Sequence, residues 1–156
     1  MIICGTGHRP DKLGGYTVEV FEKTKHTAAV WLADQQDIEL VVSGGALGWD
    51  QALAAAAREL GMDYIMALPF PGFEDRWPQS SKTYLYGLMN SAKDTKYVCD
   101  AGYAGWKMQK RNEWMVDNSD LVLALWNGTT GGTSNCISYA NKKQKPIVNL
   151  WETFSD

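Results

Sequence analysis

Short apolar runs alternate along the chain with longer stretches in which apolar residues recur at helical spacing. The short runs predict buried strands. The clearest is 121–126, whose continuous apolar character is typical of a strand covered on both faces of a sheet. The remaining runs predict strands at 2–4, 40–42, 64–68, 97–99 and 147–150.

The longer stretches predict helices. Between residues 17 and 36 the side chains of Val20, Phe21, Trp31 and Leu32 form one apolar stripe. The predicted helices cover 17–36, 50–60, 79–92, 107–118 and 133–143. Strands that alternate with helices of this length indicate one α/β domain over residues 1–156. We therefore expect a mostly parallel sheet in a three-layer α/β/α sandwich.

Three glycine-rich segments, 5–10, 43–50 and 128–133, each follow an apolar run and precede a helical stretch. Glycine at a strand-to-helix turn permits positive φ and a close approach of ligand to backbone. The helix that follows offers unpaired N–H groups and the positive end of its dipole. Because parallel strands end at the same edge, Gly7, Gly44 and Gly132 should cluster there and form a phosphate-binding cleft.

Composition narrows the function classes. The formal net charge is −3, which argues against a surface that coats nucleic acid, so nucleic acid is expected to be an unlikely partner. Cys4, Cys99 and Cys136 are scattered and should be buried free thiols. Neither metal-ligand spacing nor a cofactor motif is evident, so we expect no metal and no resident cofactor.

No apolar run approaches the roughly 20 residues that cross a bilayer, and the N-terminus shows no basic segment with a cleavage site. These features predict a cytoplasmic protein without membrane contact.

Four motifs together resemble the SLOG superfamily, which includes the Smf/DprA and LOG families, and most of all its YpsA-type branch, which has small bacterial and phage versions. The motifs occupy 6–10, 43–50, Arg111-Asn112 with Ser119-Asp120, and 131–133. The resemblance implies a Rossmann-like fold with a nucleotide or nucleotide-derived ligand at the carboxyl edge of the sheet. The enzymatic LOG branch carries a glutamate after its glycine-threonine stretch, whereas no carboxylate follows Thr133 within one helical turn.

The main candidate for phosphate contact is the start of the last long helix. Gly131, Gly132, Thr133 and Ser134 bring backbone N–H groups and two hydroxyls together there. The simpler interpretation is an N-cap, because Thr and Ser cap helices regardless of ligand. Two preceding glycines favour a phosphate cradle.

The segment 43–50 is the expected second half of the cleft. Ser43, Gly44 and Gly45 form its turn, and Asp50 either stabilises a helix dipole or binds a ribose hydroxyl.

His8 and Arg9 follow the first strand. Arg9 suits bidentate phosphate binding, and the alternative is a salt bridge to Asp11 or Glu74. His8 is expected to form hydrogen bonds or to act as an acid or base.

Two further groups of residues are candidates for the rim of the cleft. Lys107 and Arg111 form a solvated helix face, unless Arg111 reaches the cleft or pairs with Asp120. Arg76 and Trp77 lie in the loop after the third strand, where they would stack on a base or form the interface of a homodimer or higher homo-oligomer.

The leading interpretation is a sensor or sequestering protein for a nucleotide-derived small molecule, of the ADP-ribose or cyclic nucleotide type. The alternative is a hydrolase that cleaves a nucleotide N-glycosidic bond, for which Asp50 or Glu113 would supply the acid, base or nucleophile. Binding of single-stranded DNA is disfavoured here by the acidic balance and by the absence of a wide basic stripe.

Overall fold

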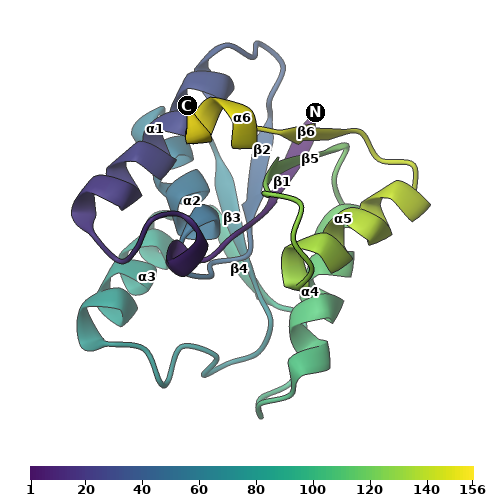
Figure 1. Cartoon of the computed structure of the whole chain (residues 1–156). Helices are drawn as coiled ribbons and strands as arrows, with labels where there is room; N and C mark the ends of the chain where they lie inside the picture. Colours follow the sequence, from purple (N-terminus) through teal and green to yellow (C-terminus); the bar gives the residue numbers. More distant parts are fainter.

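A six-stranded sheet runs through the middle of the molecule (Figure 1). The computed structural model describes all 156 residues. All strand pairs are parallel, in the order β4-β3-β2-β1-β5-β6. The strands are β1 (Ile2–Gly7), β2 (Leu40–Ser43), β3 (Tyr64–Leu68), β4 (Asp94–Tyr97), β5 (Leu121–Leu125) and β6 (Ile147–Asn149).

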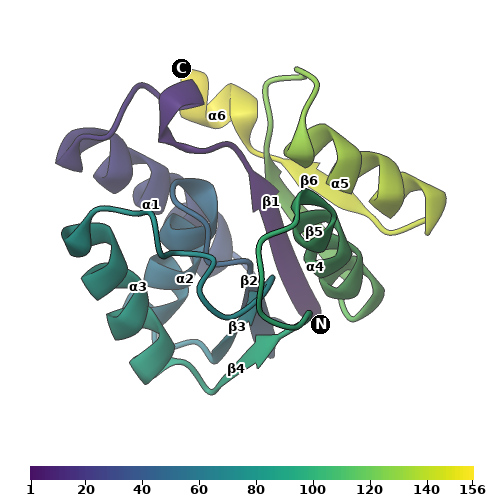
Figure 2. The same cartoon turned by 90° about the horizontal axis from the view of Figure 1, so that it is seen from below.

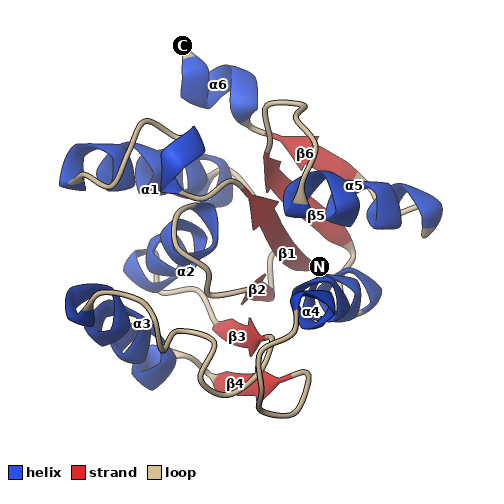
Figure 3. Cartoon of the chain, turned by 60° about the horizontal axis from the view of Figure 1, so that its bottom comes forward, coloured by secondary structure: helices blue, strands red, loops and turns tan.

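Helices cover both faces of the sheet (Figure 3). They are η1 (Pro10–Lys12), α1 (Val18–Ala33), α2 (Trp49–Glu59), α3 (Gln79–Ser91), α4 (Gly105–Asp117), α5 (Gly132–Lys142) and α6 (Trp151–Ser155). One layer contains α1, α2 and α3, with α6 beside α1, and the other contains α4 and α5. The expected three-layer Rossmann-like sandwich is confirmed, and the sheet is entirely parallel.

The order of the strands creates a switch point between β1 and β5. These two strands are neighbours, but the chain leaves β1 toward α1 and leaves β5 toward α5 on the opposite face (Figure 2). In open parallel sheets a ligand crevice forms where the connections diverge in this way, beyond the carboxyl ends of the strands.

Most predicted elements occur within one or two residues of their expected bounds. The exceptions are informative. The strand expected at 97–99 is wrong: β4 is Asp94–Tyr97, an exposed edge strand whose polar residues give no apolar signal. β1 extends to Gly7, because its glycines continue the ladder with β5 as far as Leu125. The last short helix, α6, was not expected.

Trp49 explains the glycines of β1. Its side chain is fully buried, and its indole N–H donates to the carbonyl oxygen of Leu123 at 3.2 Å. A Cβ on Gly7 would lie 2.5 Å from the indole, and one on Gly5 would lie 2.4 Å from Leu53. These glycines therefore make room for α2 to pack on the strand.

The cysteines agree with the sequence interpretation except that Cys99 is not fully buried. All three are free: Cys4 and Cys136 are buried, and Cys99 is half-buried. Burial raises the pKa of Cys4 to about 12 and that of Cys136 to about 11, so both remain thiols at neutral pH.

Gly7→Ala is expected to lower the free energy of unfolding by about 1–3 kcal/mol, because the new methyl group overpacks the contact with Trp49. Urea denaturation measures the change. Gly87→Ala is the matched control: it lies inside α3, where an added Cβ meets nothing within 4 Å. That change should stabilise the protein by about 0.5–1 kcal/mol. Equal effects of the two substitutions would contradict this account of β1.

Candidate functional site

A cleft of about 290 Å³ opens beyond the carboxyl end of β1, at the switch point of the sheet. Its walls come from the segment Thr6–Lys12, the first turn of α2, the middle of α4 and the first turn of α5. We call this hollow the anion cleft, for the charges and donors described below. The glycine turns after β1, β2 and β5 all lie at this edge, as the sequence predicts, because every strand runs in the same direction.

The first turn of α5 presents open backbone donors. Its N-cap, Gly131, has φ +142° and gives no side-chain cap. The N–H of Asn135 bonds to the carbonyl of Gly131 at 3.0 Å, whereas the N–H groups of Gly132, Thr133 and Ser134 have no partner in the chain. The hydroxyls of Thr133 and Ser134 therefore do not act as a simple N-cap, and the three donors remain available.

Arg111 and Asp50 form a buried charged floor. Arg111, from α4, is 4% exposed, and its Nη1 donates to the carbonyls of Gly44 and, at 3.3 Å, Ala67. A Cβ on Gly44 would lie 2.7 Å from Asp50 Oδ2 and 2.8 Å from Arg111 Nη1, so both charged groups converge on this glycine. The proposed pairing with Asp120 is wrong, because that carboxylate accepts from the N–H of Ile2 at the opposite edge of the sheet.

The titration of this pair follows from its burial. Burial raises the pKa of Asp50, while Arg111 and the N–H of Ala46 oppose that rise. Burial also lowers the pKa of Arg111, and Asp50 opposes that change. Each charge thus compensates the desolvation of the other.

His8 and Arg9 have different surroundings. Arg9 is exposed on the cleft and forms no ion pair. The alternative expectation, a salt bridge from Arg9 to Asp11 or Glu74, is therefore wrong. His8 is 5% exposed, and its Nε2 accepts from the N–H of Asn127 at 3.0 Å and lies 2.9 Å from the Oδ1 of the same residue. Burial lowers the pKa of His8, which favours the neutral ring that this contact requires.

Several candidates lie outside the lining of the cleft. Ser43 is buried beneath it, where its hydroxyl donates to the carbonyl of Asp50 at 2.6 Å, and Gly45 lies in the same turn with φ +74°. Lys107 donates to three carbonyls of the loop before α4, including that of Gly102. Glu113 accepts from Gln109 at 3.3 Å, away from the cleft.

The loop after β3 also stays apart. Arg76 is exposed and does not line the cleft, and Trp77 packs edge-on against Phe73 with ring centres 5.1 Å apart. Two exposed aromatic residues lie near the start of α4, Tyr103 at 82% and Trp106 at 63%.

Lys12, Met108 and Asn112 also line the cleft but were not among the expected site residues, although Asn112 belongs to one of the four motifs. Lys12 donates to the hydroxyl of Thr129 at 3.0 Å and so ties η1 to the loop before α5. Its only signal in the sequence is its place just after the first glycine turn.

The arrangement is suited to an anion. Three basic residues, Arg9, Lys12 and Arg111, line the cleft with two acidic ones, Asp11 and Asp50, and the positive end of α5 adds to the excess. No group of three or more His, Cys, Asp or Glu side chains is placed to hold a metal ion. No helix combines the length and the hydropathy that a membrane span requires.

The fold and the cleft define a Rossmann-like α/β protein with a ligand crevice at its switch point. The chain matches the family model described as the YspA SLOG family over residues 3–150, and it belongs to that family. This confirms the resemblance seen in the motifs.

Two curated relatives extend the match. The uncharacterized SPbeta prophage-derived protein YoqJ of Bacillus subtilis is 33% identical over 131 residues, which cover 74% of this chain and 76% of YoqJ. A UPF0398 protein of Bacillus cereus is 23% identical over 164 residues. The match covers 98% of this chain and 89% of the UPF0398 protein.

Solved structures share the fold at low sequence identity. DNA processing protein A (DprA) of Streptococcus pneumoniae superposes with a TM-score of 0.68 at 15% identity, and that of Helicobacter pylori with 0.67 at 21%. They cover 94% and 96% of this chain, which spans only 49% and 64% of theirs. A molybdenum cofactor binding protein of Rippkaea orientalis gives 0.60 at 18%, and the match covers 99% of this chain and 82% of that protein.

One of these structures corrects the expectation about nucleic acid. The H. pylori protein is described by its single-stranded DNA binding mode, and it has the fold of this chain. Calling nucleic acid an unlikely partner from a net charge of −3 was therefore wrong. Net charge averages over the whole surface, whereas phosphates respond to the local excess of base that the anion cleft displays.

Acidification is expected to destabilise the protein through His8. Burial lowers the pKa of His8 in the folded state, so its contribution to stability is present above the usual value near 6.5 and is lost as the pH falls through the lowered pKa. Urea denaturation from about pH 8 to pH 5 should show this loss in the wild type, and His8→Gln should flatten it. His26→Gln, an exposed control on α1, should keep it. Parallel curves for all three proteins would refute the assignment.

Proposed function

We propose that the anion cleft binds the phosphate of a nucleotide-derived small molecule, and that the protein acts as a sensor or a sequestering protein for it. The observation that carries the proposal is the uncapped start of α5, which opens into a cleft with an excess of basic residues. Anions bind at helix N-termini because the free N–H groups and the dipole both favour negative charge.

Three layers of contact support a phosphate. The N–H groups of Gly132, Thr133 and Ser134 supply directed donors. Arg9 supplies an exposed guanidinium without a carboxylate partner, and its planar fork matches two phosphate oxygens. Arg111 lies beneath them, held by backbone carbonyls, and contributes a fixed positive charge that does not have to be ordered on binding.

Binding without cleavage is part of the proposal. Cleavage of an N-glycosidic bond needs a group that stabilises or captures the developing oxocarbenium centre. Asp50 is the only one of the two candidate carboxylates on the cleft. It is 7% exposed, and its Oδ2 accepts from the N–H of Ala46 at 3.4 Å. Glu113 does not reach the lining.

Arg9→Ala should weaken binding of ADP-ribose or a cyclic nucleotide about ten- to a hundredfold, because a charge-assisted contact is typically worth roughly 1.5–3 kcal/mol. Calorimetry measures the affinity, and the melting temperature should stay unchanged because the side chain is exposed. Lys142→Ala, at the far end of α5, is the matched control and should bind as the wild type does.

A second pair of variants tests the helix start itself. An added Cβ at Gly132 meets nothing within 4 Å, so Gly132→Ala should retain binding, whereas Gly132→Asp places a negative charge in the cradle and should abolish it. An oligodeoxythymidine is titrated in parallel with the small ligands. Binding of the oligonucleotide alone, lost in Gly132→Asp, would replace the small-molecule proposal with a nucleic-acid site.

Nucleotide ligands should be recovered intact after long incubation, with no free base detected by chromatography. Release of base that disappears in Asp50→Asn would establish the hydrolase instead. The same result with Glu113→Gln alone would show that the catalytic carboxylate lies outside the cleft described above.

A further inference from the structure

A second hollow lies apart from the anion cleft. It is a cavity of about 640 Å³ between α1, α2 and α3, which we call the α1–α3 cavity. Its volume lies within the range of small-molecule sites, about 300–1,000 Å³. Neither the sequence motifs nor the proposed phosphate site involves it.

Aromatic and apolar side chains form part of the walls of this cavity, beside polar and charged ones. Phe21 of α1 and Tyr84 of α3 both line it and contact each other edge-on, with ring centres 5.4 Å apart. Tyr16 and Val18 stand at its border with 70% and 73% of their surfaces exposed. A planar ring system gains stacking and edge contacts from such walls.

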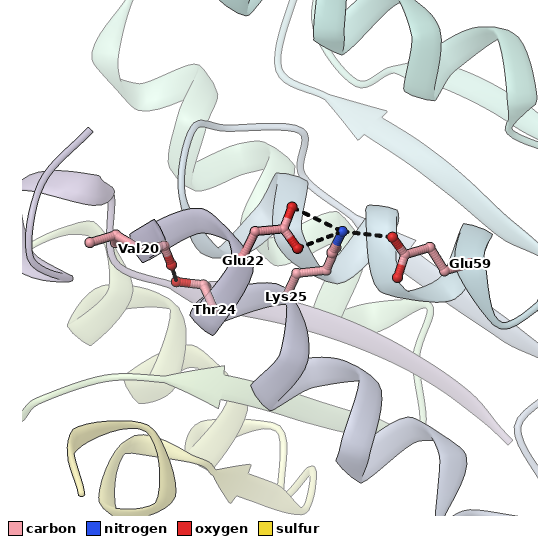
Figure 4. A network of polar contacts seen from close by, with 5 residues as sticks. All are labelled: Val20, Glu22, Thr24, Lys25 and Glu59. Carbon is pink, nitrogen blue, oxygen red and sulfur yellow. Dashed lines mark hydrogen bonds and ion pairs between the residues drawn. The ribbon is translucent and has the colours of Figure 1, made fainter. Parts of the chain in front are cut away.

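The charged end of the cavity is internally neutralised. Lys25 lies between two carboxylates, 2.6 Å from Glu59 and 3.0 Å from Glu22 (Figure 4). Arg58 stands over the ring of Tyr84 at 5.8 Å. The charges of the two acidic and two basic residues that line the cavity therefore sum to zero. The anion cleft, by contrast, has more basic than acidic residues. A lining without net charge favours an uncharged ligand over an anionic one.

Gln51 supplies the directional contact. This side chain lines the cavity and is only 4% exposed. Its Nε2 donates to the carbonyl of Gly45 at 3.3 Å, which leaves Oε1 without a hydrogen-bond partner in the protein. A largely buried acceptor on a side chain that lines a cavity can accept a hydrogen bond from a ligand.

We propose that the α1–α3 cavity is a second ligand site, which takes a neutral, planar heteroaromatic molecule whose N–H donates to Gln51 Oε1. The ring lies against Phe21 and Tyr84, and the balanced charges beside Lys25 exclude an anionic group. This site is separate from the phosphate site, since no residue lines both hollows.

Indole and 1-methylindole test the proposal as a matched pair of probes, because they differ in the N–H donor. Titration followed by ¹⁵N–¹H spectra should show indole shifting resonances of α1, α2 and α3. The methylated probe should bind about tenfold more weakly, since a buried acceptor loses its donor. In Gln51→Leu the two probes should bind alike.

Ser80→Trp, on the cavity side of α3, should fill the site and weaken indole binding at least about tenfold. Ser138→Trp, exposed on α5, is the control and should leave binding unchanged. Spectra of each variant report that it is folded. Arg9→Ala should also leave indole binding unchanged, which separates this site from the anion cleft.

Three results would each overturn the proposal. They are the absence of indole binding to the wild type, equal affinity for both probes in the wild type, and undiminished binding in Ser80→Trp.

Discussion

The packing of Trp49 on β1 is the constraint on which the rest of the edge depends. Its indole fills the space above two glycines, and its backbone N–H donates to the carbonyl of His8 at 3.1 Å. Gly48 brings the backbones together: a Cβ there would lie 2.6 Å from the carbonyl oxygen of His8. The start of α2 is thereby locked to the end of β1. That lock sets where the side chains on its first turn can reach.

The buried pair of Asp50 and Arg111 depends on this packing, because Asp50 lies on the first turn of α2. Arg111 comes from the opposite layer and crosses to the carbonyls that end β2 and β3, so it fastens α4 to the strands on which the cleft stands. A buried charge is tolerated only with compensating partners, and here Asp50 and the carbonyls provide them. The floor of the anion cleft is therefore rigid and partly positive before any ligand arrives, which lowers the ordering cost of binding.

The sequence predicts the architecture well and the site only in part. Apolar runs and glycine turns locate five of the six strands and the edge at which the turns gather, because burial and strand direction follow from local pattern. β4 was not predicted at its true position, because an exposed edge strand needs no run of apolar residues. Lys107 and Asp120 were misread because their partners, a nearby loop and Ile2, depend on three-dimensional contacts. The α1–α3 cavity has no motif at all, since it arises from how three helices pack.

The first turn of α2 is the element that the two hollows share. Asp50 lines the anion cleft, and the next residue, Gln51, lines the α1–α3 cavity. Two consecutive residues therefore belong to different hollows. Both are anchored to the same turn, where Ser43 bonds to the carbonyl of Asp50 and Gln51 to that of Gly45. A ligand that displaces this turn in one hollow necessarily moves a wall of the other. Any resulting coupling is reciprocal by thermodynamic necessity, so occupation of either site would change affinity at the other by the same factor.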